Sequence, residues 1–336
     1  MTCGGTLCRR LRCQGAAEDV TGGGSLNRMT SPVAYAESLV KKFGDFTAVD
    51  GIDFEVAPGE VFGFLGPNGA GKSSTMRMIG AVSPVTDGKL RVFDLDPRTD
   101  GPEIRGRIGV VPQENLLDMD LTVSENLLIY GRYFDLPRSL IKERIVELLD
   151  FAQLTDKKDA NVDAISGGMQ RRLTIARSLI NEPRLVLLDE PTTGLDPQAR
   201  HILWDRLYRL KQQGVTLIIT THYMDEAEQL CDRLVVMDEG KIVAEGSPRE
   251  LIRKYATRDV VELRFPVGVQ ETVVASLEPM ADRLEILPDR VLMYTTDGDS
   301  TMRAVNAAGL EPETVVERRS SLEDVFLRLT GRSLTD

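Results

Sequence analysis

One run of residues has the composition of a loop that binds phosphate groups. It reads Gly66-Pro67-Asn68-Gly69-Ala70-Gly71-Lys72-Ser73, and Ser74 follows. Glycines let backbone N–H groups approach a polyphosphate, and the helix that is expected next adds positive potential at its N-terminus. The sequence therefore predicts a nucleotide site in which Lys72 reaches the β- and γ-phosphates and Ser73 binds Mg²⁺. The alternative is a chance glycine-rich turn.

Two carboxylates directly follow an apolar run at residues 185–188. At the end of a buried strand, Asp189 is placed to hold Mg²⁺ directly or through water. Glu190 points elsewhere because it is one residue further on, and it is placed to polarise an attacking water molecule as a general base. Without the phosphate loop, the same pair would be read as a solvated strand end.

A second anion-binding helix start is predicted at residues 165–172. Ser166 is a natural N-cap, and Gly167 and Gly168 leave backbone amides open to an anion. A second such site makes little sense within one ATP pocket. It does make sense if two chains face each other and each offers this helix start to the ATP of the other, which predicts a homodimer.

Strands that alternate with helices indicate an α/β domain. Period-two alternation over 52–56 predicts a half-buried strand, whereas continuous apolar runs predict strands buried on both faces. Those runs lie at 61–65, 185–188 and 217–219. Helical spacing is present near Met76 and over 198–213. Residues 121–154 predict two helices, separated at Pro137.

The last part of the chain predicts a small α+β domain. Its basic residues are all arginine from residue 257 onward. The expected strands are 260–265 and 290–294, and the expected helices are 300–308 and 322–329. The predicted organisation is a disordered tail at 1–32, a large domain at 33–247 with a helical part at about 114–160, and an accessory domain at 257–336.

Composition excludes several function classes. Asp and Glu total 52 against 41 Lys and Arg, a net charge of −11 in 336 residues, which argues against nucleic acid as the main partner. No stretch approaches the roughly 20 apolar residues of a membrane span. The first residues lack the apolar core of a secretory signal, so a reducing cytoplasmic location is expected.

The tail carries three of the four cysteines, at Cys3, Cys8 and Cys13, and the fourth is Cys231. Their spacing is not that of a close zinc-binding pair, so free thiols are expected, with a metal site in the tail as the alternative. Met29 is an alternative candidate for the start of translation. His201 is expected to lie on a helix surface without a functional role.

Together these motifs resemble the ABC transporter ATPase family, whose signature matches Ile165-Ser166-Gly167-Gly168-Met169. Other elements of the family occur in the expected order. Phe43 is similar to the aromatic residue that stacks on adenine, Gln113 to the Q-loop glutamine, Asp196 to the D-loop aspartate and His222 to the switch histidine that contacts the γ-phosphate. Taken singly, each could be an ordinary core, loop or surface residue.

The resemblance implies a P-loop NTPase fold of the ABC type and ATP and Mg²⁺ as cofactors. It also implies that Ser73, Gln113 and Asp189 hold the metal. Ile165 and Met169 replace the family's usual leucine and glutamine, but the Ser-Gly-Gly centre is intact. Phe43 lacks a tyrosine hydroxyl, yet stacking needs only the ring.

A narrower resemblance is to the daunorubicin-resistance and nodulation-factor export group. It rests on the segments at 221–228 and 321–326, and residues 198–201 with Trp204 favour the nodulation branch. Members of this group pair with a separate ABC-2 type permease and export lipophilic drugs or lipo-oligosaccharides. The resemblance thus implies an export ATPase held at the cytoplasmic face of the inner membrane through its permease.

Two other functions are weighed against the exporter subunit. One is a soluble ABC ATPase of a cytoplasmic assembly scaffold, which the export-type C-terminal segment disfavours. The other is a nucleotide-gated regulatory or translation-associated module, but such proteins usually carry two cassettes in one chain. A P-loop kinase or GTPase does not explain the site at Ser166-Gly167-Gly168.

Overall fold

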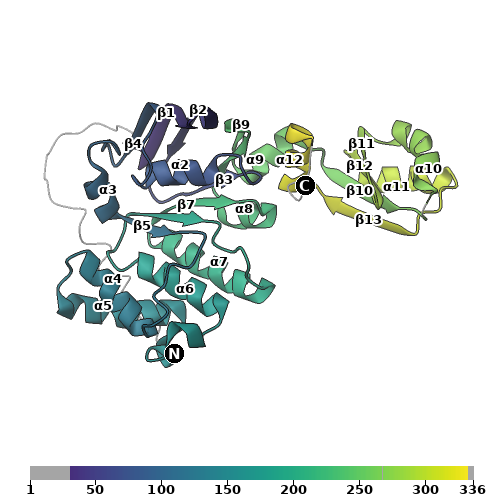
Figure 1. Ribbon diagram of the computed structural model, residues 1–336. Coiled ribbons are helices and arrows are strands. Elements are labelled where there is room, and N and C mark those ends of the chain that lie inside the picture. Colours follow the sequence, from purple (N-terminus) through teal and green to yellow (C-terminus); the bar gives the residue numbers. More distant parts are fainter. Residues whose placement is uncertain (1–30, 267, 332–336) are drawn as a thin grey trace, which may run out of the picture. The chain divides into compact units, whose positions relative to one another are not determined.

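The computed structural model describes residues 31–266 and 268–331, which divide into two compact units between Ile242 and Val243 (Figure 1). The division lies close to residue 247, where the sequence places the end of the large domain. The tail expected at 1–32 lies almost wholly outside the described residues, as do Met29, Cys3, Cys8 and Cys13.

A six-stranded sheet in the order β5-β6-β7-β3-β8-β9 has its first five strands at the centre of the first unit, and the division at Ile242 falls within its last strand, β9. Its strands are β3 (Val61–Leu65), β5 (Ile108–Val111), β6 (Leu185–Asp189), β7 (Thr216–Thr221), β8 (Arg233–Asp238) and β9 (Lys241–Gly246). The first five strands in this order are parallel to one another. The apolar runs predicted to be strands form β3, β6 and β7, and their side chains are buried on both faces of the sheet.

Strand β3 lies in the middle of this sheet, between β7 and β8. Leu65, its last residue, is level with Thr221 of β7 and with Val236 of β8. The residues that follow β3 and β7 therefore meet at the carboxyl edge of the sheet, where ligands of α/β proteins usually bind.

A three-stranded antiparallel sheet, in the order β2-β1-β4, packs against this core. It consists of β1 (Ala34–Phe43), β2 (Phe46–Val56) and β4 (Asp87–Val92). The predicted alternation over 52–56 is confirmed, because these residues of β2 are alternately buried and exposed. The ring of Phe54 contacts Phe62 and Phe64 of β3, with centroids 6.2 and 5.2 Å apart.

Helix α2 packs its apolar residues between the two sheets, in one continuous core. The helices associated with the large sheet are α2 (Lys72–Ile79), α3 (Gly101–Arg107), α6 (Gly167–Ser178), α7 (Pro197–Gln212) and α8 (Met224–Leu230). The helices predicted near Met76 and over 198–213 are thus confirmed. His201 is exposed on α7, as expected.

The two predicted helices of the helical part are also present. They are α4 (Val123–Tyr133) and α5 (Arg138–Ala152), followed by the short 3-10 turns η1 (Thr155–Lys157) and η2 (Val162–Ala164). Thr122 caps α4 in a reciprocal box with Glu125. Pro137 precedes the first residue of α5, as its fixed backbone angle favours. These helices pack against α6, which connects them to the sheet.

The second unit is a four-stranded antiparallel sheet in the order β11-β12-β10-β13, with helices. Its elements are α9 (Pro248–Tyr255), β10 (Asp259–Arg264), α10 (Gln270–Leu277), η3 (Glu278–Met280), β11 (Arg283–Leu287), β12 (Arg290–Thr295), α11 (Gly298–Ala307), β13 (Thr314–Arg319) and α12 (Leu322–Thr330). The two strands and two helices predicted here are β10, β12, α11 and α12. The sequence analysis missed α9, α10, β11 and β13 and the short turn η3.

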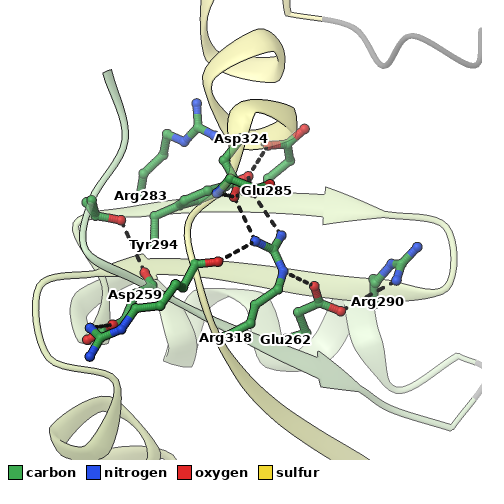
Figure 2. Close-up of polar contacts among 11 residues, drawn as sticks. Asp259, Glu262, Arg283, Glu285, Arg290, Tyr294, Arg318 and Asp324 are labelled. Carbon is green, nitrogen blue, oxygen red and sulfur yellow. Dashed lines mark hydrogen bonds and ion pairs between the residues drawn. The ribbon is translucent and has the colours of Figure 1, made fainter. Parts of the chain in front are cut away.

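A polar network crosses the sheet of the second unit, with Arg318 at its centre (Figure 2). Arg318 donates to Asp324 through both terminal nitrogens, at 2.7 and 2.9 Å, and through Nε to Glu262 at 2.6 Å. The hydroxyl of Tyr294 can donate its one proton to either Asp324 (3.1 Å) or Glu285 (3.2 Å). Burial acts to raise the pKa of Asp324, but the hydrogen bonds from Arg318 and from the backbone of Ser321 outweigh it and lower this pKa.

In the described ranges, 31–266 and 268–331, no helix is both long enough and apolar enough to cross a membrane. Cys231, the one cysteine in those ranges, is a buried free thiol.

Candidate active site

The phosphate loop connects β3 to α2, and two of its glycines are required by its shape. A Cβ atom on Gly66 would lie 2.2 Å from the carbonyl oxygen of Met237. Gly71 has a φ of +98°, and a Cβ there would lie 2.4 Å from the carbonyl oxygen of Ala48. These close approaches to β8 and β2 fix the loop at the carboxyl edge of the sheet.

Lys72 lies under this loop, and only 4% of it is exposed. Its Nζ donates to the carbonyl oxygens of Gly66 (2.7 Å) and Pro67 (2.9 Å) and lies 3.8 Å from Oε1 of Glu190. Burial lowers the pKa of Lys72, while the charges of Glu190 and Asp189 oppose this shift. The geometry places a cation directly beside the loop amides and the carboxylates.

Asp189 ends β6 and accepts two hydroxyl hydrogen bonds through Oδ1. Ser73 donates at 3.0 Å and Thr220 of β7 at 2.5 Å. A carboxylate and a serine hydroxyl held together are hard oxygen ligands of the kind Mg²⁺ prefers. Thr220 is a contact that the sequence analysis missed, because it directly follows the apolar run at 217–219 and belongs to no recognised motif.

Glu190 has a left-handed backbone, with φ of 44°, and this strained turn directs its carboxylate back into the site. Gln113 donates to its Oε2 at 3.1 Å and Thr193 at 3.2 Å. His222 Nδ1 lies 3.3 Å from its Oε1, outside good hydrogen-bond geometry. The contact with His222 is the main cause that lowers the pKa of Glu190, and the Lys72 charge adds to it against the effect of burial.

A pocket of about 220 Å³ lies over the loop and includes the side chains expected around a nucleotide. Its lining residues are Phe43, Phe46, Ala48, Asn68, Gly69, Ala70, Gly71, Lys72, Ser73, Ser74, Gln113 and Glu190. Phe43 and Phe46 face each other across the β1–β2 turn and are 52% and 64% exposed. The sequence analysis singled out Phe43 and missed Phe46.

The other predicted phosphate contacts lie apart from this pocket. Ser166 caps α6 by accepting from the backbone N–H of Met169 at 3.3 Å, as predicted. Asp196 caps α7 by accepting from Ala199 N–H at 2.9 Å. A Cβ on Gly168 would lie 3.4 Å from Ala199, so the two helix starts are neighbours. In the described part of the chain, Ser166, Gly167, Gly168 and Asp196 do not line the pocket that contains Lys72.

Arg171, in the first turns of α6, contacts the backbone of the site residues Gln113, Asp189 and Glu190. The sequence analysis assigned it no role. Arg171 is 3% exposed. Its guanidinium donates to the carbonyl oxygens of Pro112 (2.5 Å), Gln113 (3.2 Å), Asp189 (3.1 Å), Glu190 (3.1 Å) and Pro191 (2.7 Å). Burial lowers its pKa to about 10, so it stays a cation at neutral pH.

The two units of the chain match different family descriptions. Residues 49–193 match the family "ABC transporter", and residues 270–331 match "Nodulation factor export protein NodI, C-terminal domain". The first match contains the phosphate loop, Gln113, the helix start at Ser166 and both Asp189 and Glu190. The second contains most of the α+β unit.

Curated relatives align with nearly the whole chain. The Nod factor export ATP-binding protein I of Ralstonia nicotianae is 46% identical over 312 residues, covering 91% of this chain and 96% of its own length. The protein of the same name from Rhizobium sp. (strain N33) is 48% identical over 306 residues, covering 90% and 99%.

Solved ATP-binding cassettes share the fold of the first unit. The dimeric cassette MJ0796 in a post-hydrolysis state with ADP and Pi has a TM-score of 0.59 and 26% identity, covering 64% of this chain and 98% of its own. The cbiO1 subunit of Clostridium perfringens has a TM-score of 0.62 and 27% identity, covering 75% and 98%. The chain therefore belongs to the ATP-binding proteins of ABC transporters and is an ATPase of that family with a NodI-type C-terminal domain.

Proposed function

We propose that this chain is the ATP-hydrolysing subunit of an exporter, that two copies close around two ATP molecules, and that this closure drives a separate ABC-2 type permease. The observation that carries the proposal is the separation of two phosphate-binding elements. The pocket with Lys72 is formed without Ser166, Gly167 and Gly168. A second copy would supply that helix start to the open side of each ATP.

In this proposal, hydrolysis uses residues that already lie close together. Glu190 takes a proton from water while the water oxygen attacks the γ-phosphorus and ADP leaves. Lys72 holds the phosphates, and His222 donates to the γ-phosphate, which carries the growing charge. Phe43 stacks on adenine, with Phe46 as a second ring beside it. Asp196 lies at the interface between the two copies.

Mg²⁺ fits the oxygen donors of Ser73, Asp189 and Gln113. When bound, it would neutralise charge on the phosphates that Lys72 also contacts. The hydroxyl of Ser73 and the carboxylate of Asp189 are already 3.0 Å apart. A single carboxylate suits Mg²⁺, because this ion is usually held by one or two carboxylates together with substrate phosphates.

A groove that leads away from Gln113 supports docking of a permease. One hollow of about 480 Å³ is lined by Ser73, Gln113 and Asp189, and a second of about 380 Å³ is lined by Ile129, Tyr130 and Tyr133 of α4. Val110, Pro112 and Leu116 line both. Leu116 and Tyr133 are 61% and 76% exposed, so the groove offers apolar surface to a partner.

The proposed substrate class is lipophilic or resembles a lipo-oligosaccharide, as the names of the relatives as Nod factor export proteins suggest. The chain would be held at the cytoplasmic face of the inner membrane by its permease. Residues 33–247 would act as the ATP-binding domain, with about 114–160 as its helical part, and 257–336 as an accessory domain.

The test is affinity purification of tagged protein from gently solubilised native membranes, followed by mass spectrometry. We expect a polytopic membrane protein in about equal amount. Tyr133→Asp should reduce its recovery, whereas Val146→Asp, at a residue of α5 that is 67% exposed and does not line the groove, should not. Recovery of a soluble scaffold instead would overturn the exporter and favour a cytoplasmic assembly ATPase.

A further inference from the structure

We infer that Arg171 is a positioning residue for ATP hydrolysis, which sets the places of Gln113 and Glu190 by holding the backbones of both their loops from one point. The inference deepens the proposed function and rests on the roles assigned there to Gln113 and Glu190.

The guanidinium bridges two segments that are far apart in the sequence. Its acceptors at Pro112 and Gln113 follow β5, and those at Asp189, Glu190 and Pro191 follow β6. Strands β5 and β6 are paired, but their hydrogen bonds end at Val111 and Leu188. After these residues, Arg171 connects the two segments through its hydrogen bonds to the backbones of Gln113 and Glu190.

Only an arginine suits this arrangement. Five carbonyl oxygens surround the group in two sets, and a guanidinium offers five N–H donors in a fixed planar fork. A lysine has three donors at a single point and cannot reach both loops at once. Without Arg171, each of these carbonyl groups would lose a hydrogen-bond partner, although that of Glu190 also accepts from the backbone N–H of Thr193 at 3.4 Å. That loss would favour a rearrangement of the loops.

The support comes from a rigid element. Arg171 lies in α6, whose residues from Arg171 to Ser178, apart from Arg172, are buried against the sheet and the helical part. The backbone N–H of Glu190 is also bonded to Thr220 of β7, but among the described hydrogen bonds of Arg171 are acceptors in both loops. We therefore expect the 3.1 Å contact between Gln113 Nε2 and Glu190 Oε2 to depend on Arg171. Its hydrogen bonds go to these two loops, with one long contact to Asn115, and it contacts no atom of the phosphate loop in the described hydrogen bonds.

This separation predicts a split between catalysis and binding. Arg171→Lys should lower kcat by roughly 10- to 100-fold, the effect of misplacing reacting groups by about 1 Å. Affinity for a fluorescent ATP analogue without Mg²⁺ should change by less than about threefold, because Lys72 and the loop amides are untouched. Arg171→Gln provides a second variant, for use if the lysine variant fails to fold.

Arg172→Lys is the matched control. Arg172 is the next residue of α6 and also donates to a carbonyl oxygen, that of Ala152 at 2.7 Å, but at the end of α5 and away from the site. Its kcat should stay near that of the wild type at a similar loss of melting temperature. If both variants lower kcat equally, or if folded Arg171→Lys keeps wild-type kcat, the inference is wrong.

A double-mutant cycle of Arg171→Lys and Gln113→Ala distinguishes a positioning role of Arg171 from a purely structural one. In a Gln113→Ala background, Arg171→Lys should lower kcat by much less than in the wild type, because one of its two targets is gone. Full additivity would overturn the inference. Glu190→Gln, measured alongside, separates the two proposals: wild-type turnover in that variant would remove the assigned base, whatever Arg171 does.

Discussion

The cluster around Glu190 and the network around Arg318 both place a basic side chain against carboxylates, but they hold these groups differently. In the first, Glu190 is contacted by a lysine, a glutamine, a threonine and a histidine from several segments of the chain, at 3.1 to 3.8 Å. In the second, Arg318 of β13 donates two hydrogen bonds, of 2.7 and 2.9 Å, to Asp324 in the first turn of α12 (Figure 2).

The two clusters differ in whether their polar groups are accessible to a ligand. The polar groups near Lys72 line a pocket and can exchange their contacts for those of a ligand. Asp324 is 1% exposed, and each of its oxygens already accepts from Arg318. Charged residues at loops thus point to chemistry, whereas a closed bidentate pair on a sheet points to the stability of its own unit.

The largest expected effect is that of Glu190→Gln. This variant should lower kcat by roughly 10³-fold, because it removes the proposed base but keeps the shape and the contact with Gln113. Phosphate release measures the loss. Size-exclusion chromatography with ATP should show a dimer that accumulates, since binding outlasts hydrolysis. An unchanged rate would remove Glu190 as the base.

The matching change in the second unit is Asp324→Asn. It leaves the Arg318 cation with a neutral partner, and should lower the unfolding free energy of that unit by about 2–3 kcal/mol, discounted because Arg318 is partly exposed. Chemical denaturation measures it. Affinity for ATP should not change. Loss of ATP binding at full folding would show that this network serves the nucleotide site.

The difference in stability between the wild type and Asp324→Asn should depend on pH. The folded-state pKa of Asp324 lies below its ordinary value of 3.8, so its ionised form stabilises the fold above that pH. The stability advantage of the wild type over Asp324→Asn should be constant from neutral pH to about pH 5. It should then shrink as the pH falls through the folded-state pKa. An advantage that grows on acidification would contradict the assignment.

Lys72→Ala should weaken ATP binding by roughly tenfold or more, the equivalent of about 1.5–3 kcal/mol for a hydrogen bond to a charged group. Equilibrium titration with a fluorescent ATP analogue is the measurement. Lys142, on the exposed side of α5, offers a control substitution to alanine that should leave the affinity as it was. If Lys72→Ala binds the ATP analogue as tightly as the wild type, the proposed contact of Lys72 with the phosphates is wrong.

The smallest effect is expected for Tyr294→Phe. It removes the hydroxyl that can donate to either Asp324 or Glu285, and should cost about 1 kcal/mol of unfolding free energy, since Arg318 still holds Asp324. Denaturant midpoints compare it with Asp324→Asn. A loss as large as that of Asp324→Asn would mean that the tyrosine, rather than the arginine, keeps the network together.

The sequence predicted the first unit better than the second for a physical reason. The phosphate loop, Asp189 and Ser166 are recognised by short local patterns, because glycine turns, strand ends and helix caps each need particular residues. The role of Arg171 has no such pattern, since its acceptors are carbonyl groups that every residue carries. Strands β11 and β13 were missed because they lie at the two edges of their sheet and, unlike β12, carry no run of buried apolar residues.

The central place of β3 has a consequence for synthesis on the ribosome. Its partners β7 and β8 are translated about 150 residues later, which at about 5–20 residues per second means a delay of roughly 10–30 s. During that time the newly made phosphate loop has neither Met237 nor Thr221 beside it to fix its shape. We therefore expect the nascent chain to gain its affinity for nucleotide late. The strands of the second unit pair across at most 60 residues, so that sheet can form soon after its own translation.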